Sequence, residues 1–257
     1  MKTWLAWLSA VTFSFVMLLV TLPAHGDTSI KVSCSFSHTL KDDPIVFPNQ
    51  PGASHRHDFF GNDSTDAYST TASMEGQTTS CASDNPGDTA GYWTPSLKVN
   101  KTVTHDVGFS AYYYRRNEGM LTPYPQGFQM VAGNSHATGA QSRSVVYYGC
   151  GNGTSQPVVN YMPDCTADGT HLYIHILFPW CWDGVFTGGN DTAHVAYGPC
   201  DAAHPYHFPQ LVERINWDAV VNATHGVKFT SGAWYSVHAD YLSVWADGAL
   251  EDLIASL

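Results

Sequence analysis

Histidines and aspartates beside aromatic rings are the residues of this chain whose types and spacing could do chemistry. Residues 54–62 read SHRHDFFGN, in which one residue separates His55 from His57 and Asp58 follows at once. Side chains alternate between the two faces of a strand, so residues i and i+2 share one face. His55 and His57 therefore have the spacing of two metal ligands on one strand, and Asp58 could orient an imidazole ring.

A second pair with the same spacing lies near the end of the chain. His238 and Asp240, in YSVHADY, would share one strand face, as a ligand or general base does with its orienting carboxylate. A His-x-His pair is more often two polar side chains on a solvated face. Here Phe59 and Phe60 indicate partial burial, and a buried imidazole needs a partner. We therefore predict that the two pairs meet in one cleft.

Other residues could complete an acid–base site. The chain has only four glutamates, so a paired-carboxylate glycosidase would need aspartates. The candidates are Asp58, Asp183 and Asp240, with Asp183 and Asp240 as the hydrolase pair. In a lyase, Tyr241 or Tyr92 could act as the proton donor. His194, in HVAY, is an alternative third metal ligand. The candidate catalytic residues are His55, His57, Asp58, Asp183, His194, His238, Asp240 and Tyr241.

Aromatic residues are the candidates for substrate binding. Tyr92, Trp93, Trp182 and Trp245 lie close to Pro, Gly or Asp in the sequence, as exposed platforms do. Flat rings stack on sugars, although for any single ring a place in the core is the alternative interpretation. The chain has no G-x-S-x-G elbow, no H-E-x-x-H and no phosphate loop.

The composition restricts the class of partner. Eleven Lys and Arg stand against 22 Asp and Glu, giving a net charge of −11 at pH 7. This charge repels nucleic acid and anionic membranes. It also disfavours a strongly polyanionic substrate, unless a local basic patch such as Arg115-Arg116 receives it. Charged residues and aromatic residues each make up 13% of the chain, which suits a neutral polar partner. We expect a monomer that binds a polysaccharide or cell-wall glycan.

The N-terminal segment, residues 1–26, has the features of a secretory signal peptide. Lys2 precedes a long apolar run, and Ala-His-Gly supplies small residues before Asp27. The alternatives are an uncleaved anchor, or cleavage two residues earlier that leaves His25 to chelate copper through its amine and ring. Export is the better interpretation. Residues 27–257 are then expected to form one secreted, extracellular domain.

All six cysteines follow this segment. An even number in an oxidising compartment indicates three disulfides, although six cysteines allow fifteen pairings. Sequence order suggests the pairs Cys34–Cys81, Cys150–Cys165 and Cys181–Cys200.

The hydrophobic pattern predicts an all-β fold. Alternating segments typical of strands occur at residues 30–36, 107–114, 145–148 and 171–178, separated by Gly-, Pro- and Asn-rich turns. Only LEDLIASL, residues 250–257, is typical of a helix. Many short strands joined by such turns indicate a single-domain β-sandwich or jelly roll with long loops.

Several ordered motifs together resemble one protein family. They are DDPIV at 42–46, GASHRHDFFGN at 52–62, YWTP at 92–95, GFQMVAG at 127–133, CWDG at 181–184, HVAY at 194–197 and HADY at 238–241. The chain resembles the secreted bacterial and fungal proteins of domain-of-unknown-function family nineteen ninety-six. The resemblance implies a site at His55, His57, Asp183, His194, His204, His238 and Asp240. Because members are sometimes joined to cell-wall or carbohydrate-binding modules, it also implies a polysaccharide setting.

Three functions remain open at this point. The favoured one is a secreted enzyme that cleaves a polysaccharide, as a lyase or a hydrolase, with a His/Asp site. The second is a zinc or copper protein, hydrolytic or oxidative, with the metal held by His55, His57 and His238 or His194. The third is a wall- or sugar-binding module without turnover.

Overall fold

The fold is given by a computed structural model of the chain. The structure describes residues 28–104, 106–116, 119–151, 158–167, 169–185 and 192–257. The predicted signal peptide, residues 1–26, and the alternative copper ligand His25 lie outside the described residues. Among the residues described, no helix has the length and apolar character needed to cross a membrane.

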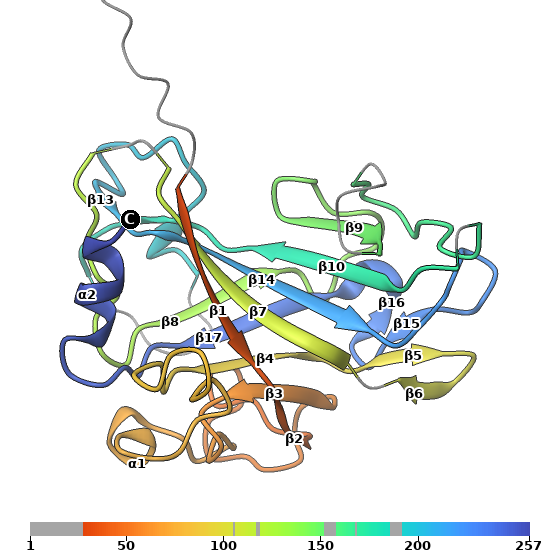
Figure 1. The fold of residues 1–257 in the computed structure, drawn as a ribbon, viewed down its shortest axis with the longest axis horizontal. Coiled ribbons are helices and arrows are strands. Elements are labelled where there is room, and N and C mark those ends of the chain that lie inside the picture. Colours follow the sequence, from red (N-terminus) through yellow and green to blue (C-terminus); the bar gives the residue numbers. More distant parts are fainter. Residues whose placement is uncertain (1–27, 105, 117–118, 152–157, 168, 186–191) are drawn as a thin grey trace, which may run out of the picture.

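Two five-stranded antiparallel sheets make up most of the domain (Figure 1). Sheet I has the order β1-β7-β14-β10-β9, and sheet II has the order β2-β3-β4-β17-β8. The strands of sheet I are β1 (Ser29–Cys34), β7 (Asp106–Tyr114), β9 (Val146–Cys150), β10 (Leu172–Leu177) and β14 (Gln210–Trp217). The strands of sheet II are β2 (Phe36–Leu40), β3 (His57–Gly61), β4 (Gly91–Pro95), β8 (Gln129–Gly133) and β17 (His238–Leu242).

Two smaller sheets extend this frame. One has the order β12-β11-β13, and the other has the order β16-β15-β5-β6. Their strands are β5 (Leu97–Val99), β6 (Thr102–Thr104), β11 (Cys181–Trp182), β12 (Val195–Ala196), β13 (Tyr206–His207), β15 (Lys228–Phe229) and β16 (Gly232–Ala233). A 3-10 turn, η1 (Trp234–Ser236), leads into β17.

The main core fills the space between sheets I and II. Alternation along the strands of sheet II sends Phe60, Tyr92 and Tyr241 toward sheet I, where they join Phe109 and Tyr113 in one buried cluster. The rings of Phe60 and Phe109 stack with centroids 4.4 Å apart. The predicted all-β, sandwich-like fold is confirmed by this arrangement.

The opposite face of sheet II carries a second, smaller apolar cluster. Phe59, Trp93 and Leu242 project from it and pack with Ile45 and Met74. Ile45 belongs to the loop that joins β2 to β3, and Met74 ends α1 (Thr71–Met74). The outer face of sheet II is therefore covered by loop rather than exposed to solvent.

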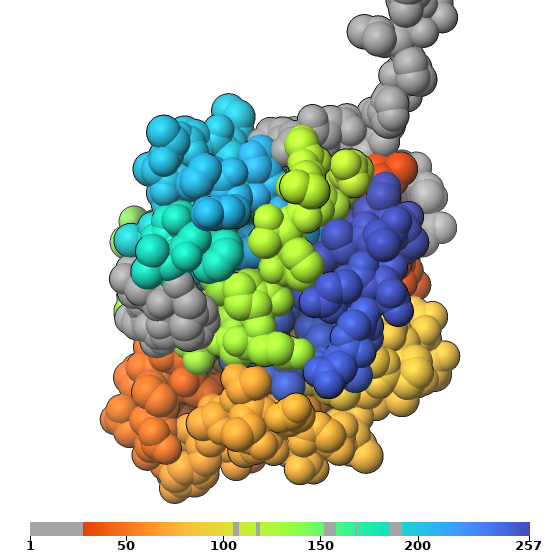
Figure 2. All heavy atoms as spheres, turned by 90° about the vertical axis from the view of Figure 1, so that its left-hand side faces the viewer, coloured from red at the N-terminus to blue at the C-terminus, as the bar shows by residue number. Residues whose placement is uncertain are grey.

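Disulfides and a terminal helix close the frame. The bonds join Cys34–Cys81, Cys150–Cys165 and Cys181–Cys200, the pairing that sequence order predicted. The predicted C-terminal helix is α2 (Ala249–Ala255), which buries Leu250, Leu253 and Ile254. Figure 2 shows this dark blue segment packed beside the yellow-green chain that leads into β8.

Candidate functional site

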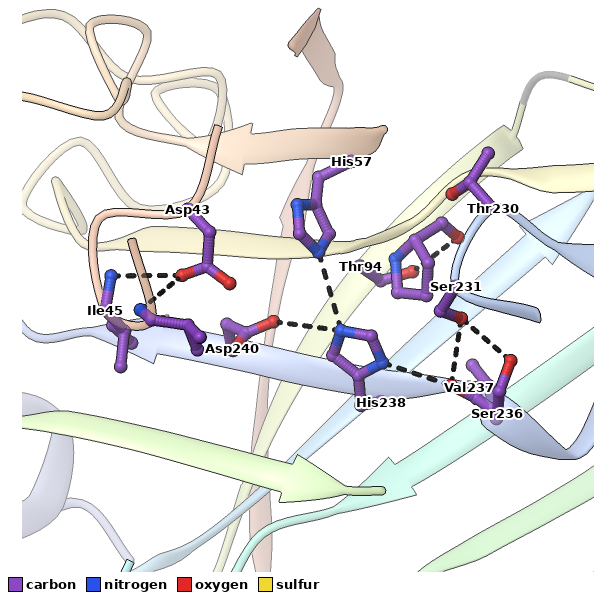
Figure 3. Close-up of polar contacts among 12 residues, drawn as sticks. Asp43, Ile45, His57, Thr94, Thr230, Ser231, Ser236, Val237, His238 and Asp240 are labelled. Atoms are coloured by element: carbon purple, nitrogen blue, oxygen red, sulfur yellow. Dashed lines mark hydrogen bonds and ion pairs between the residues drawn. The ribbon is translucent and has the colours of Figure 1, made fainter. Parts of the chain in front are cut away.

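Two histidines face each other on the outer face of sheet II. His57 begins β3 and pairs with Pro95 of β4, while Asp240 of β17 pairs with Trp93 of the same strand. Continuing this register places His238 beside Pro95 from the other side. The two imidazoles therefore reach toward one another, as Figure 3 shows, with their Nε2 atoms 3.5 Å apart.

Backbone carbonyls fix the tautomer of both neutral rings. The Nδ1 atom of His57 lies 2.9 Å from the carbonyl oxygen of Asp42, and that of His238 lies 3.1 Å from the carbonyl oxygen of Ser236. A carbonyl oxygen can only accept, so both Nδ1 atoms carry the proton. In the neutral rings both Nε2 atoms are then unprotonated. Two lone pairs point at the same small volume.

A third histidine, His55, completes a cluster of imidazoles. Its ring centroid lies 4.3 Å from that of His57 and 5.0 Å from that of His238. One ring nitrogen from each of the three lies within 4.8 Å of the others. The His55 Nε2 atom is buried and has no hydrogen-bond partner among the described residues. Three nitrogen ligands for one ion are therefore present.

Asp240 adds a carboxylate to the cluster. It lies two residues after His238 on the same strand face, and its Oδ2 atom is 3.8 Å from His238 Nε2. The side chain is 0% exposed, and no described residue donates a hydrogen bond to either oxygen. A buried carboxylate without a donor is costly in a metal-free site, on the order of 1–3 kcal/mol or more.

Asp43 is a site residue that the sequence analysis did not assign. One of its oxygens lies within 4.8 Å of ligand atoms from both His57 and Asp240. Its Oδ1 atom accepts hydrogen bonds from the backbone N–H groups of Ile45 and Val46, at 3.0 and 2.9 Å. These bonds fix the carboxyl group at the edge of the cluster (Figure 3). The signal available in the sequence was the DDP motif at 42–44.

Burial disfavours the charged form of these groups when no cation is present. Desolvation lowers the pKa of His55 to about 4 and that of His238 to about 3, and it lowers the pKa of His57 well below the usual value. Burial also raises the pKa of Asp43, and it raises the pKa of Asp240 well above the usual value. A bound cation would reverse the effect on the carboxyl groups by supplying the missing positive charge.

A cleft of about 520 Å³ leads to the cluster from the surface. Asp43, His55, His238 and Asp240 line it, and the exposed His136 lies on its wall. The other polar lining residues are uncharged: Ser54, Asn134, Ser135, Thr192 and Ser231. The buried cluster therefore lies at the base of an open cleft, and catalytic metal sites differ from closed structural ones in keeping one position open.

Comparison with protein families agrees with the sequence motifs. The family model described as Domain of unknown function (DUF1996) matches residues 43–245. The chain belongs to this family. No curated protein and no solved structure matches the chain.

The DUF1996 motifs contribute unequally to the site. Asp58 alternates to the opposite face of β3 from His57, where it accepts hydrogen bonds from Thr39 at 3.0 Å and Ser96 at 2.6 Å. This carboxylate supports the junction of β2, β3 and β5 and does not orient the imidazole. The orienting role belongs to the carbonyl oxygen of Asp42.

Two further candidates lie outside the cluster. Asp183 follows β11 and accepts a hydrogen bond from the backbone N–H of Val185 at 2.7 Å. The His194 Nε2 atom lies 2.9 Å from the carbonyl oxygen of Gln129, and the ring packs against Phe128. Neither side chain belongs to the groups of potential ligands that surround His57.

The aromatic candidates do not form an exposed platform. Tyr92, Trp93, Tyr241 and Trp245 are at most 3% exposed. Tyr241 points into the main core, where its hydroxyl accepts a hydrogen bond from the Trp245 indole at 3.0 Å. Only Trp182 is half-buried, and it packs against neighbouring rings. The tyrosine proton donor expected for a lyase is therefore not placed beside the histidines.

Proposed function

We propose that the protein is an extracellular metal-dependent enzyme that acts on a polysaccharide. The metal ligands are His55, His57, His238 and Asp240, with Asp43 beside them. The observation that carries the proposal is the pair of Nε2 lone pairs facing each other at 3.5 Å, with both Nδ1 protons held by backbone carbonyls. Ligating histidines are held in this way, with the second ring nitrogen donating to a carbonyl or carboxylate.

Zinc is the ion that best suits this set of ligands. Three imidazole nitrogens and one carboxylate favour zinc or copper over magnesium or calcium, which prefer oxygen. A bound zinc ion would supply Lewis-acid polarisation of a substrate or water oxygen. The backbone carbonyls of Asp42 and Ser236 would hold the two imidazoles in register. His136 would be the exposed imidazole available for proton exchange with the substrate.

The cleft supports a sugar as the substrate. Its lining offers hydroxyl and amide groups, which exchange hydrogen bonds with sugar hydroxyls, together with apolar walls from Val46, Phe47 and Val131. The hydroxyl and amide groups of this lining agree with a neutral sugar unit in the cleft itself. The three disulfides agree with an oxidising, extracellular setting.

Elemental analysis combined with a glycan panel tests the proposal. We expect about one zinc or copper ion per chain, and chelator-sensitive release of oligosaccharides from at least one wall polysaccharide. His57→Ala and His238→Ala should lose both the ion and the activity. Activity without metal would instead support the His/Asp lyase or hydrolase. A bound ion without turnover on any glycan would support a binding module.

A further inference from the structure

A second site is formed by lysines at the junction of β5, β6 and β15. Lys98, Lys101 and Lys228 line a hollow of about 570 Å³, together with Asn100 and Gly226. These are three of the six lysines in a chain whose net charge is −11. Such a concentration of positive charge is not expected from the composition.

Two of the lysines lie directly opposite each other on neighbouring strands. Lys98 and Lys228 are cross-strand partners in the antiparallel pair of β5 with β15. Side chains in such positions lie about 5 Å apart at Cβ, and like charges there are destabilising. No described acidic residue forms an ion pair with either ammonium group, and none lines the hollow. The repulsion is therefore not compensated within the described chain.

The third lysine occupies an unfavourable backbone position. Asn100 and Lys101 form the two-residue turn between β5 and β6, with φ values of +50° and +71°. This turn type favours Asn followed by Gly, because both residues have positive φ. Lysine in place of glycine costs about 1 kcal/mol or more. The turn thus places a third ammonium at the hollow at the expense of local stability.

Short segments of the chain connect the lysine hollow to the metal cleft. Lys228 lies three positions before Ser231, which lines that cleft. Lys98 lies three positions after Pro95, the cross-strand partner of His57. Since three extended residues span at most about 11 Å, a single oligosaccharide can contact both places.

We propose that the lysine hollow binds an acidic group, carboxylate or sulfate, on the polysaccharide that occupies the metal cleft. This inference rests on the proposed function for the identity of the polymer, whereas anion binding at the lysines is independent of the metal. It makes the substrate an acidic polysaccharide whose charged sugars lie to one side of the reacting one. The overall negative charge of the protein then excludes polymers whose charges fall elsewhere.

Binding by calorimetry to metal-free protein tests the inference. The probes are tetragalacturonate for carboxylate, a chondroitin sulfate tetrasaccharide for sulfate, and cellotetraose as the neutral sugar. The protein is produced without N-glycosylation, because Asn100-Lys101-Thr102 is a glycosylation sequon. We expect at least one acidic probe to bind and cellotetraose to bind at least tenfold more weakly.

A pair of double variants distinguishes binding at the lysine hollow from a general effect of net charge. Lys98→Gln/Lys228→Gln should weaken binding of the acidic probe about tenfold, or by 1.4 kcal/mol. The control Lys31→Gln/Arg143→Gln removes the same charge from exposed positions elsewhere and should change binding less than twofold. At low salt, Lys228→Gln alone should also raise the melting temperature by about 1–3 °C, because it relieves the repulsion.

Several outcomes would overturn the inference. Equal loss of binding in the control would assign it to net charge. Equal binding of cellotetraose would remove the role of the lysines, and equal binding of a single-stranded oligonucleotide would show a general polyanion site. Loss of the acidic probe's binding in His238→Ala would also contradict the inference, because the lysines are expected to hold the anion without the metal. If the metal proposal alone fails, anion binding at the lysines should remain.

Discussion

Replacing His238 by alanine should remove most of the stabilisation that a bound metal ion gives to the folded protein. In the wild-type protein, an ion that binds the folded state alone stabilises it by RT ln(1 + [M]/Kd), which is about 2.7 kcal/mol at a hundredfold excess over Kd. For a domain of this size, 1 kcal/mol corresponds to about 2–4 °C. Zinc at that excess should therefore raise the melting temperature of the metal-free protein by about 5–11 °C.

The variant loses one of the two facing Nε2 ligands. Loss of a partner that only orients a ligand already weakens metal binding by about 10–100-fold, so loss of a ligand should cost at least 100-fold. At the same zinc concentration the stabilisation then falls to about 0.4 kcal/mol, or about 1–2 °C. The metal-free variant should itself lose about 1–3 kcal/mol, because it gives up the hydrogen bond to the Ser236 carbonyl and some packing.

The assay is a melting curve with chelator and with added zinc, and the matched control is His194→Ala. His194 is also a buried histidine whose ring nitrogen meets a backbone carbonyl, but it lies outside the cluster. The control should be destabilised by a similar amount and keep the full zinc shift. A wild-type protein without a zinc or copper shift, or a His238→Ala protein with an undiminished one, would refute the metal site.

Three further predictions concern the frame. Asp88 is buried, and desolvation raises its pKa to about 7, so stability should fall as pH rises from about 4 to 7. Asp88→Asn should remove on the order of 4 kcal/mol of that pH dependence in denaturant titrations at pH 4 and 8. Gly61→Ala would place the new Cβ 2.1 Å from the Ala90 carbonyl oxygen, in a backbone with φ +76°, and should lower the free energy of unfolding by roughly 2–5 kcal/mol. The control Gly76→Ala, which also has a positive φ but open space around it, should lower it by about 1 kcal/mol. Removing one disulfide should cost about 2–5 kcal/mol by the same denaturation assay.

The local hydrophobic pattern predicted the fold class and several strands, but it could not predict how the strands pair or where the shortest ones lie. Period-two alternation located the strands that became β1, β7, β9 and β10 with small errors at their ends. The pattern gave no information on which strands pair, because sheet order depends on contacts distant in sequence. The two-residue strands such as β15 were missed because they are too short for any alternation to be visible.

For the candidate site, strand alternation grouped the central residues correctly but did not place the residues around them. The i, i+2 rule places His238 with Asp240 on one face, as the structure shows, but it does not indicate which face lies under a loop. Asp58 was grouped with His57 because they are adjacent, although adjacent strand residues point to opposite faces. Asp43 lies in an irregular loop, where no periodicity exists to place its side chain. Burial of Trp93 and Tyr92 depends on both faces of β4 being covered, which is a tertiary property.

The outer face of sheet II combines features that a purely structural face would avoid. Its apolar cluster around Phe59 and Trp93 would pack as well against alanine or valine as against His57, His238 and Asp240. Buried groups without donors cost stability, and natural proteins keep such local conflicts mainly where function requires them. The conflict ends if a cation is bound, because the same lone pairs and carboxylate become its ligands. The lysines of β5 and β15 are the opposite case, because a bound anion would relieve the repulsion between their ammonium groups. The two proposed sites have opposite charge preferences, so the substrate we propose is anionic at one end and neutral where it reacts.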